Sequence, residues 1–361
     1  MRIAVPKEIK NHEYRVGLTP ASVAELTVAG HEVFIQTQAG MGIDFSDKDY
    51  QAVGAQIVAT AADAFSRADM IVKVKEPQPG EIAMLEARHT LFTYLHLAAD
   101  KPQAQGLMKS GATCIAYETV TAKNGTLPLL KPMSEVAGRM SVQVGAHYLE
   151  KEQGGRGVLL GGVPGVAPAR VAILGGGVAG VNAAQMAVGM RADVTIYDIN
   201  NDRLAELDMF FSSQIKTAYA SRAAIAAAVA KAHLVIGAVL VPGAAAPKLV
   251  TREMLKTMKR GSVLVDIAID QGGCFETSHA TTHDDPVFVE EGVIHYCVAN
   301  MPGAVARTSA FALNNATLPF VLKLANQGTE PAMAADPHLA NGLNVRAGKI
   351  EHQAVAEALN L

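Results

Sequence analysis

The sequence predicts an α/β fold with two doubly wound parallel sheets, in which one domain is inserted into the chain of the other. The first observation is an alternation of short apolar runs with helix-length amphipathic segments, which is typical of parallel sheets covered on both faces. The second is a glycine-rich turn at 175–180, between an apolar run and an alanine-rich segment. The third is the position of that turn, because about 170 residues precede it, enough for a separate domain.

The first domain is predicted from short apolar or β-branched runs near the start of the chain. We expect strands at 2–5, 32–37, 70–74, 91–95 and 113–117. The amphipathic segment 20–29 is predicted to be a helix between two of them, with Thr19 as its N-cap. The end of the chain is predicted to return to this domain through a long helix that includes 313–324. The tail beyond Gln327 is expected to be irregular, with a helix near 351–359.

The inserted domain is predicted to begin with a long helix at 132–153, which has Ser134 near its start. A glycine-rich loop at 154–168 follows this helix. Six strands, the number in a complete dinucleotide-binding domain, are then expected at 171–174, 193–197, 217–220, 234–240, 262–270 and 293–298. These expectations divide the chain into residues 1–130 with 305–361, and residues 131–304.

The turn at 175–180 has the spacing of a dinucleotide-binding fingerprint. Gly175 permits a tight turn, Gly177 lets the backbone approach a pyrophosphate, and Gly180 lets the helix pack on its strand. The first N–H groups of that helix are suited to bind the phosphates. Asp198 closes the next strand, where it can accept hydrogen bonds from an adenosine ribose and would repel a 2′-phosphate. The pattern predicts a Rossmann-like domain that binds NAD rather than NADP.

The composition argues against several classes of function. A net charge of −3, a pI near 6.4 and the lack of a basic run argue against nucleic-acid binding. Residues 1–8 have no apolar signal core, and the weakly charged stretch 157–190 is too rich in glycine for a membrane helix. Three cysteines without metal spacing indicate reduced thiols, and His279 and His283 lack further ligands for a metal. We expect a soluble, cytoplasmic protein without a metal.

Three polar residues of the first domain are expected at the carboxyl edge of its sheet, where ligands of open α/β sheets bind. Lys75 and His96 each follow an apolar run, and Arg15 lies in the loop after the first one. Together they are suited to bind a small carboxylate and to move a proton. Each has a plainer alternative: a solvated surface arginine, a lysine that snorkels at a strand end, and a histidine buried in the core.

Two aspartates mark the corresponding edge of the second domain. Asp266 and Asp270 lie in and after the strand predicted at 262–270, which should run beneath the nicotinamide end of a bound cofactor. A turn or N-cap aspartate is an equally good interpretation of either one. Gly272 and Gly273 then allow a backbone to approach a ligand, or form a simple turn.

Several of these segments together resemble the alanine dehydrogenase family, which belongs to a superfamily shared with pyridine nucleotide transhydrogenases. The resemblance covers nearly the whole chain and is specific. The segments that carry it are PKE at 6–8, RVGLTP at 15–20, VKVKEP at 72–77, FTYLHLA at 92–98, PMSEVAGR at 132–139, LLGGVPGV at 159–166, DIAIDQGG at 266–273 and NMPGAV at 300–305.

The resemblance implies an NAD-dependent oxidative deamination of L-alanine to pyruvate and ammonia, in which a hydride passes reversibly from the α-carbon to nicotinamide. It implies that Arg15 and Lys75 bind the substrate carboxylate and carbonyl. His96 is then the acid and base, and Asp270 is a second catalytic or positioning group. The family resemblance also implies a homohexamer.

The cofactor contacts implied by the resemblance surround the fingerprint. They are Ser134, Gly175, Gly177, Val178, Ala179, Gly180, Asp198, Arg203, Ala220, Val239, Leu240, Ile267, Asp270, Val298 and Met301. Two departures from the family pattern are visible. His279 stands where many members have an arginine, which affects one expected phosphate contact. Ala306 stands where most have a proline.

Two other functions compete with this interpretation. An NAD-binding transhydrogenase subunit shares the fold and many motifs, but it transfers hydride between nucleotides and needs no acid and base for a small substrate. A catalytically silent NAD sensor would not need Arg15, Lys75, His96 and Asp270 together. Turnover of L-alanine distinguishes the predicted enzyme from both.

Overall fold

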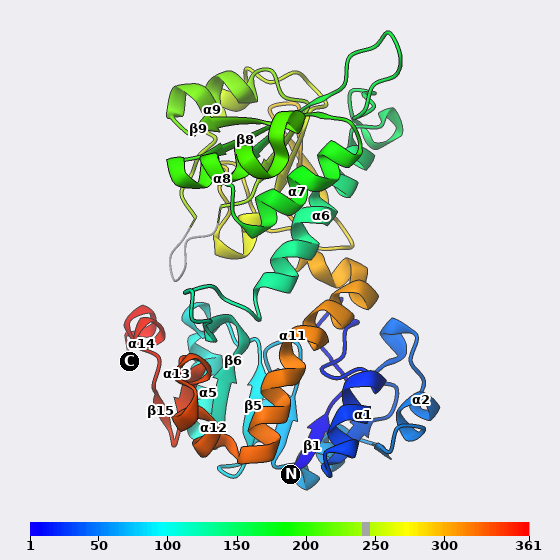
Figure 1. Ribbon diagram of the computed structural model, residues 1–361, viewed down its shortest axis with the longest axis vertical. Coiled ribbons are helices and arrows are strands. Elements are labelled where there is room, and N and C mark those ends of the chain that lie inside the picture. Colours follow the sequence, from blue (N-terminus) through cyan, green and yellow to red (C-terminus); the bar gives the residue numbers. More distant parts are fainter. Residues whose placement is uncertain (240–245, 361) are drawn as a thin grey trace. The chain divides into compact units, whose positions relative to one another are not determined.

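The computed structural model describes residues 1–239 and 246–360 (Figure 1). The chain forms two compact units, which we call unit 1 (Met1–Met133 with Val305–Leu361) and unit 2 (Ser134–Ala304). Each unit has one mostly parallel sheet with flanking helices, and unit 2 is inserted into the chain of unit 1. The predicted fold class is therefore confirmed.

Unit 1 is built on an eight-stranded sheet with the order β15-β14-β6-β5-β4-β1-β2-β3. The strands are β1 Arg2–Val5, β2 Glu32–Gln36, β3 Gln56–Val58, β4 Met70–Val72, β5 Thr90–Thr93, β6 Thr113–Ala116, β14 Leu343–Arg346 and β15 Lys349–Ile350. The strands β6, β5, β4, β1, β2 and β3 are neighbours in that order and run parallel to one another. Strand β14 is antiparallel to both β6 and β15.

The tail beyond Gln327 differs from the expected irregular segment. It contains two short helices, α12 Thr329–Ala335 and α13 Pro337–Ala340, and the β14–β15 hairpin before the final helix, α14 Gln353–Leu359. The hairpin turns at Ala347 and Gly348, which both have positive φ, and β14 pairs with β6, the last of the parallel strands on that side. The tail is ordered because it covers an edge of the unit 1 sheet, a long-range contact that has no local sequence signal.

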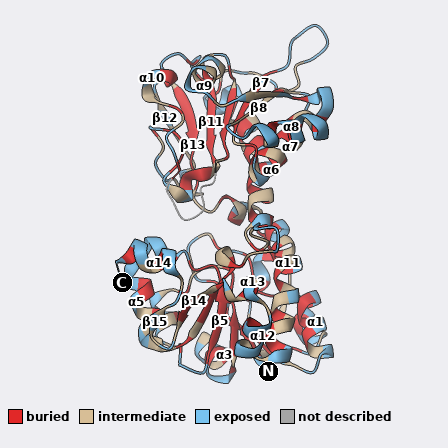
Figure 2. Cartoon of the chain, turned by 60° about the vertical axis from the view of Figure 1, so that its left-hand side comes forward, coloured by how far each residue is buried: buried red, intermediate tan, exposed pale blue. Residues whose placement is uncertain are grey.

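Helices cover both faces of the unit 1 sheet, and strands β4 and β5 are buried along their whole length (Figure 2). The helices are α1 Pro20–Val28, α2 Asp47–Gln51, α3 Ala61–Arg67, α4 Pro79–Ile82, α5 Lys101–Ser110, α11 Ala306–Gln327, α12 Thr329–Ala335, α13 Pro337–Ala340 and α14 Gln353–Leu359. Thr19 caps α1 as predicted, since its side chain accepts a hydrogen bond from the Ser22 N–H. Asn314 of α11 accepts from both the Thr19 N–H and the Ser22 hydroxyl, which fixes α11 against α1.

Unit 2 has seven strands in the order β12-β13-β11-β10-β7-β8-β9, one more than predicted. They are β7 Arg170–Leu174, β8 Asp193–Asp198, β9 Lys216–Tyr219, β10 Leu234–Gly237, β11 Val263–Asp266, β12 Val287–Glu290 and β13 Val293–Tyr296. The additional strand, β12, pairs with β13 in an antiparallel hairpin, and the other pairs are parallel. Its turn at Glu291 and Gly292, both with positive φ, is the signal that the sequence interpretation missed.

The helices of unit 2 begin with α6 Lys131–Tyr148, whose first residues precede the unit boundary. The others are α7 Val178–Gly189, α8 Asn201–Phe211, α9 Arg222–Val229 and α10 Arg252–Leu255. The helix predicted at 132–153 therefore ends early, and a separate 3₁₀ turn, Lys151–Gln153, follows it. The strand predicted at 262–270 ends at Asp266, where a 3₁₀ helix, Ile267–Gln271, begins.

The strand order of unit 2 reverses between β7 and β10. From β7 the chain passes outward through β8 and β9, and from β10 it passes outward in the other direction through β11 and β13. Ligands of doubly wound sheets bind beyond the carboxyl ends of the strands at such a reversal. The glycine-rich turn directly after β7 lies at this point.

Candidate functional site

The glycines of the turn at 175–180 have distinct structural roles. Gly175 has a φ of 106°, and a Cβ there would lie 2.7 Å from the Ala238 carbonyl oxygen. A Cβ at Gly180 would lie 1.9 Å from the carbonyl oxygen of Gly175, so only glycine lets α7 approach the turn. Gly177, the N-cap of α7, has an ordinary φ of −70°, and a Cβ there would meet nothing within 4 Å. The fold therefore requires Gly175 and Gly180 but leaves open space at Gly177.

Asp198 and Arg203 hold the glycine turn from the adjacent strand and helix. One carboxylate oxygen of Asp198 accepts from the Gly176 N–H at 2.7 Å, and the other accepts from the Asn200 N–H at 2.9 Å. The Arg203 Nε donates to the Gly176 carbonyl oxygen at 2.8 Å. Asp198 thus lies directly beside the turn, at the end of β8.

The other predicted cofactor residues lie mostly just after strands of unit 2. Ser134 is in the first turns of α6, and Val178 and Ala179 begin α7. The residues that follow β9, β10, β11 and β13 are respectively Ala220, Val239, Ile267 and Val298, and Met301 begins a 3₁₀ helix. The structure therefore brings the residues after β9, β10, β11 and β13 to the carboxyl edge of one sheet. Leu240 lies outside the described residues.

The structure separates the roles of Asp266 and Asp270. Asp266 is fully buried and accepts from the Cys274 N–H at 2.9 Å, the Ser278 hydroxyl at 2.6 Å and the Ala268 N–H at 3.1 Å. Burial raises its pKa, although these donors oppose the rise. Asp266 therefore organises the loop after β11, whereas Asp270 is exposed at the 3₁₀ helix Ile267–Gln271 and is accessible to a ligand.

Arg15 of unit 1 is buried and held in one orientation by Glu13. The carboxylate of Glu13 accepts from Arg15 Nε at 2.7 Å and Nη2 at 2.5 Å, and also from the Arg15 backbone N–H. The third guanidinium nitrogen, Nη1, lies 3.0 Å from the Met133 sulfur. Burial alone would lower the pKa of Arg15, but Glu13 outweighs burial and the pKa is raised. The alternative of a solvated surface arginine is therefore wrong.

Lys75 follows β4 and is 12% exposed at its side chain. Its ammonium lies 3.9 Å from the Glu76 carboxylate, and its carbonyl oxygen accepts from the Thr93 hydroxyl of β5 at 3.0 Å. These contacts place a partly accessible cation at the carboxyl edge of the unit 1 sheet.

His96 is not a core histidine, because its side chain is 46% exposed. It has a φ of 51°, in the left-handed region, and its backbone N–H donates to Glu118 at 2.6 Å. The imidazole stacks on the buried Tyr94 ring, with centroids 5.7 Å apart and planes 8° from parallel, and its Nδ1 lies 4.0 Å from the Glu118 carboxylate. The ring is therefore oriented by Tyr94 and Glu118 while its edge stays accessible.

The sequence interpretation missed the residues that hold the predicted ones. Glu13, Tyr94 and Glu118 respectively orient Arg15, the His96 ring and the His96 backbone. Glu13 lies two residues before Arg15, and Tyr94 lies two residues before His96. Both pairs lie outside the strands, and His96 has a positive φ, so strand alternation gives no signal for Glu13 or Tyr94.

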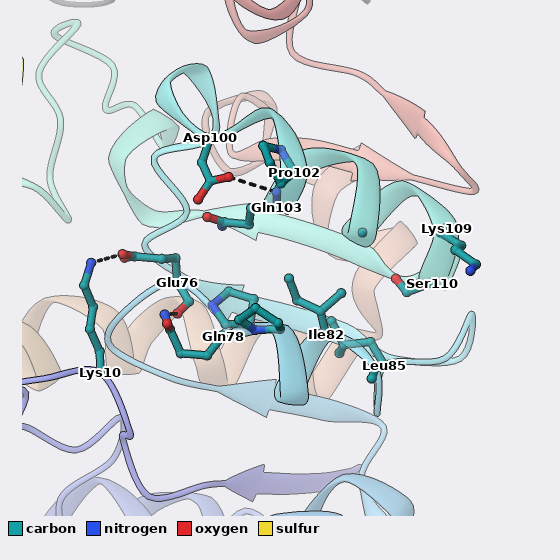
Figure 3. A pocket seen from close by; sticks show the side chains of 14 residues that line it. Lys10, Glu76, Gln78, Ile82, Leu85, Asp100, Pro102, Gln103, Lys109 and Ser110 are labelled. Atoms are coloured by element: carbon teal, nitrogen blue, oxygen red, sulfur yellow. Dashed lines mark hydrogen bonds and ion pairs between the residues drawn. The ribbon is translucent and has the colours of Figure 1, made fainter.

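Hollows on unit 1 are lined by some of these residues. A groove of about 420 Å³ is lined by residues 7–15, 38, 39, 41 and 42, so it includes Arg15. A larger groove of about 760 Å³ lies between α4 and α5, where Lys10 forms an ion pair with Glu76 and Asp100 lies opposite (Figure 3). Glu76 thus lines this larger groove, and its carboxylate also lies 3.9 Å from the Lys75 ammonium.

Other features of the described residues bear on metals and membranes. No three metal-binding side chains of residues 1–239 and 246–360 gather at one place. His283 donates to the Asn300 carbonyl oxygen through Nε2 at 3.2 Å, which supports the loop before Met301. At the two positions that depart from the family pattern, His279 stacks on Phe288 with ring centroids 3.7 Å apart, and Ala306 is buried at the start of α11. In the described part of the chain, no helix is long and apolar enough to cross a membrane.

Sequence models for the two parts of one family match almost the entire chain. The model described as the N-terminal domain of alanine dehydrogenase/PNT matches residues 4–137, and the model of its C-terminal domain matches residues 141–353. The chain belongs to the alanine dehydrogenase/PNT family. The resemblance seen in the sequence is therefore confirmed.

Curated members of the alanine dehydrogenase/PNT family are similar along their full length. The chain is 62% identical to an alanine dehydrogenase of Halomonas elongata and 58% identical to one of Mycolicibacterium smegmatis, over 100% of this chain and 97% of each relative. A solved L-alanine dehydrogenase superposes with a TM-score of 0.97 at 56% identity, covering 100% of this chain and 99% of the other. A transhydrogenase from Sinorhizobium meliloti superposes with a TM-score of 0.84 at 26% identity, covering 98% and 100%.

Proposed function

We propose that the protein is an NAD-dependent L-alanine dehydrogenase, which interconverts L-alanine with pyruvate and ammonia. The observation that carries this proposal is the full-length identity of 62% to a curated alanine dehydrogenase, compared with 26% to the solved transhydrogenase. Arg15, Lys75 and His96 at the carboxyl edge of the unit 1 sheet supply the chemistry that a small amino acid requires.

NAD fits the residues of unit 2. The open space at Gly177 accommodates a pyrophosphate, and the first N–H groups of α7 supply its hydrogen bonds. The Asp198 carboxylate, fixed beside the turn, accepts from ribose hydroxyls and repels a 2′-phosphate. When bound, the nicotinamide accepts the hydride that leaves the alanine α-carbon.

In the proposed mechanism the residues of unit 1 bind and orient the substrate. The guanidinium of Arg15, which Glu13 holds in one orientation, donates to the substrate carboxylate. A guanidinium presents its donors in one plane, which an ammonium does not do. The ammonium of Lys75 donates a hydrogen bond to the oxygen that develops on the α-carbon, and it thereby polarises the forming carbonyl group. Holding the α-hydrogen in one orientation lowers the entropic part of the barrier.

Proton transfer is assigned to His96 and Asp270. After the substrate ammonium has lost one proton to solvent, loss of hydride leaves an iminium ion, to which water adds before ammonia leaves. His96 takes a proton from the attacking water and returns it to the nitrogen. As the C–N bond breaks, His96 takes the remaining hydroxyl proton, so that pyruvate and ammonia form, and it releases this proton to solvent. The exposed carboxylate of Asp270 stabilises the cationic nitrogen of the imine and ammonium.

The test is an assay of the purified protein with NAD and L-alanine at alkaline pH, followed by NADH absorbance. The expected result is NADH formation that requires L-alanine, and the reverse reaction with pyruvate, ammonia and NADH. Hydride exchange between nucleotides without alanine would support the transhydrogenase alternative. Tight NADH binding with no turnover of any kind would support the sensor.

The glycine turn gives a prediction that separates folding from cofactor binding. Gly177→Ala should leave the Tm of the ligand-free protein unchanged, because the new methyl meets nothing, and should weaken NADH binding by about tenfold or more. Gly180→Ala should itself lower the free energy of unfolding by about 1–3 kcal/mol, because its methyl overlaps the Gly175 carbonyl. Thermal melts and NADH fluorescence titrations measure both, and an unchanged NADH Kd in Gly177→Ala would contradict the placement of the pyrophosphate.

Asp270→Asn tests the carboxylate of unit 2. We expect kcat to fall by about 10²-fold while NADH binds with unchanged affinity, because the amide keeps the shape but lacks the charge. Asp208→Asn, at another exposed aspartate on α8, is the control and should leave kcat unchanged. Steady-state kinetics with NADH titration make the comparison, and near-normal turnover of Asp270→Asn would remove Asp270 from the mechanism.

Two broader expectations belong to the same proposal. The family resemblance favours a homohexamer, which light scattering of the purified protein measures directly. The buried thiols of Cys114, Cys274 and Cys297 suit a reducing compartment such as the cytoplasm.

A further inference from the structure

A buried charge cluster surrounds Lys73, which lies two residues before the proposed substrate-binding residue Lys75. Lys73 follows β4 and is fully buried. Its ammonium donates to Glu8 at 2.9 Å and to Glu81 at 2.8 Å, and both carboxylate side chains are 2% exposed. We call these three residues the Lys73 cluster.

Each carboxylate of the cluster uses its second oxygen to hold a backbone N–H. Glu8 accepts from the Val74 N–H at 2.7 Å, and Glu81 accepts from the Gln78 N–H at 2.8 Å. The chain between these two N–H groups includes Lys75. Because the Lys75 carbonyl also accepts from the Thr93 hydroxyl, the backbone of Lys75 is fixed from both sides.

Stability alone does not account for such a cluster. Two carboxylates share one buried ammonium, and well-packed apolar residues in place of a buried ionic triad are often at least as stable. Burial raises the pKa of Glu8, and the Lys73 ammonium and the Val74 N–H oppose this rise. Burial would also lower the pKa of Lys73, but the two carboxylates outweigh burial and raise it. The fixed hydrogen-bond geometry of the cluster therefore calls for an explanation other than the stability of the fold.

We propose that Glu8 is a positioning residue, which sets the ammonium of Lys75 relative to the guanidinium of Arg15. Glu8 lies between β1 and α1, in the same loop as Arg15, and it holds the N–H that precedes Lys75. A single carboxylate thus joins the two segments that carry the substrate-binding cations. This inference rests on the proposed alanine dehydrogenase function and adds a residue that acts through others.

The cluster contains its own matched control. Glu8→Gln and Glu81→Gln each remove one carboxylate of equal burial, which bonds Lys73 with one oxygen and a backbone N–H with the other. Each variant leaves Lys73 with one carboxylate, so the two variants have the same formal charge in the cluster. The amide in each variant has one acceptor oxygen, so it can no longer hold both Lys73 and its backbone N–H in place. The two variants differ in where that hold is lost, beside Lys75 or at the start of α4.

Glu8→Gln is expected to raise the KM for pyruvate by about tenfold or more, because a small displacement of a binding group has a large kinetic effect. Glu81→Gln should change this KM by less than about twofold, since it leaves the Val74 N–H bond intact. NADH Kd should be unchanged in both, and thermal melts should show similar losses of stability. Equal KM changes in the two variants, or no change in Glu8→Gln, would overturn the proposal.

A fully apolar replacement covers the case in which Glu8→Gln does not fold. The triple variant E8L/K73M/E81L removes every charge of the cluster and should fold, yet its KM for pyruvate should rise as in Glu8→Gln. A folded triple variant with the KM of the original protein would overturn the positioning role. The unsubstituted protein is assayed alongside, so that absence of alanine turnover there refutes the proposed function rather than the role of Glu8.

Discussion

Replacing His96 by alanine is expected to lower kcat by about 10²–10⁴-fold, the range that a general acid and base contributes. NADH binding should persist, because His96 belongs to unit 1 and every proposed dinucleotide contact is in unit 2. Stability should change little, since the imidazole is 46% exposed and contacts the rest of unit 1 mainly by stacking on Tyr94. Steady-state kinetics, NADH fluorescence titration and a thermal melt on the same preparation make the test.

His147 provides a matched control for this experiment. Its side chain is 51% exposed, and its Nδ1 lies 3.5 Å from Glu150, so its environment resembles that of His96 beside Glu118. His147→Ala should therefore retain full kcat. Turnover of His96→Ala within about threefold of the original would show that another group moves the proton.

The parts of the site that could be predicted from the sequence are those with a local cause. Gly175 and Gly180 are recognisable because the turn after β7 requires one positive φ and one close backbone approach within six residues. Lys75 and His96 are recognisable because each lies three residues after the end of an apolar strand, β4 at Val72 and β5 at Thr93. In both cases the chain itself places the residue, so spacing and residue type carry the information.

Contacts between distant segments could not be predicted in this way. Glu8 and Lys73 are 65 residues apart, and nothing near either one indicates that they form a buried pair. The same reason explains the tail, because β14 is stable only when paired with β6, more than 200 residues earlier. Asp266 and Asp270 also looked equivalent in sequence, until burial and three hydrogen bonds assigned Asp266 to the loop.

Replacing Arg15 by methionine should affect both stability and substrate binding. Glu13, which is fully buried at its side chain, loses the guanidinium that it binds through two oxygens, and breaking such a buried pair costs about 3–5 kcal/mol. The KM for pyruvate should rise by on the order of 10²-fold or more, because hydrogen bonds to charged groups contribute about 1.5–3 kcal/mol each. Urea denaturation measures the first effect, and initial rates at saturating NADH and ammonia measure the second.

The two effects of Arg15 separate in the double variant E13Q/R15M. Without a carboxylate at position 13 no buried charge is left unpaired, so most of the stability should return. The KM should stay high, since nothing replaces the donors to the substrate carboxylate. Arg15→Lys should fall between, because it keeps the charge that faces Glu13 but not the planar fork that donates two parallel bonds. Recovery of the original KM in E13Q/R15M would mean that Arg15 supports the loop and does not bind the substrate.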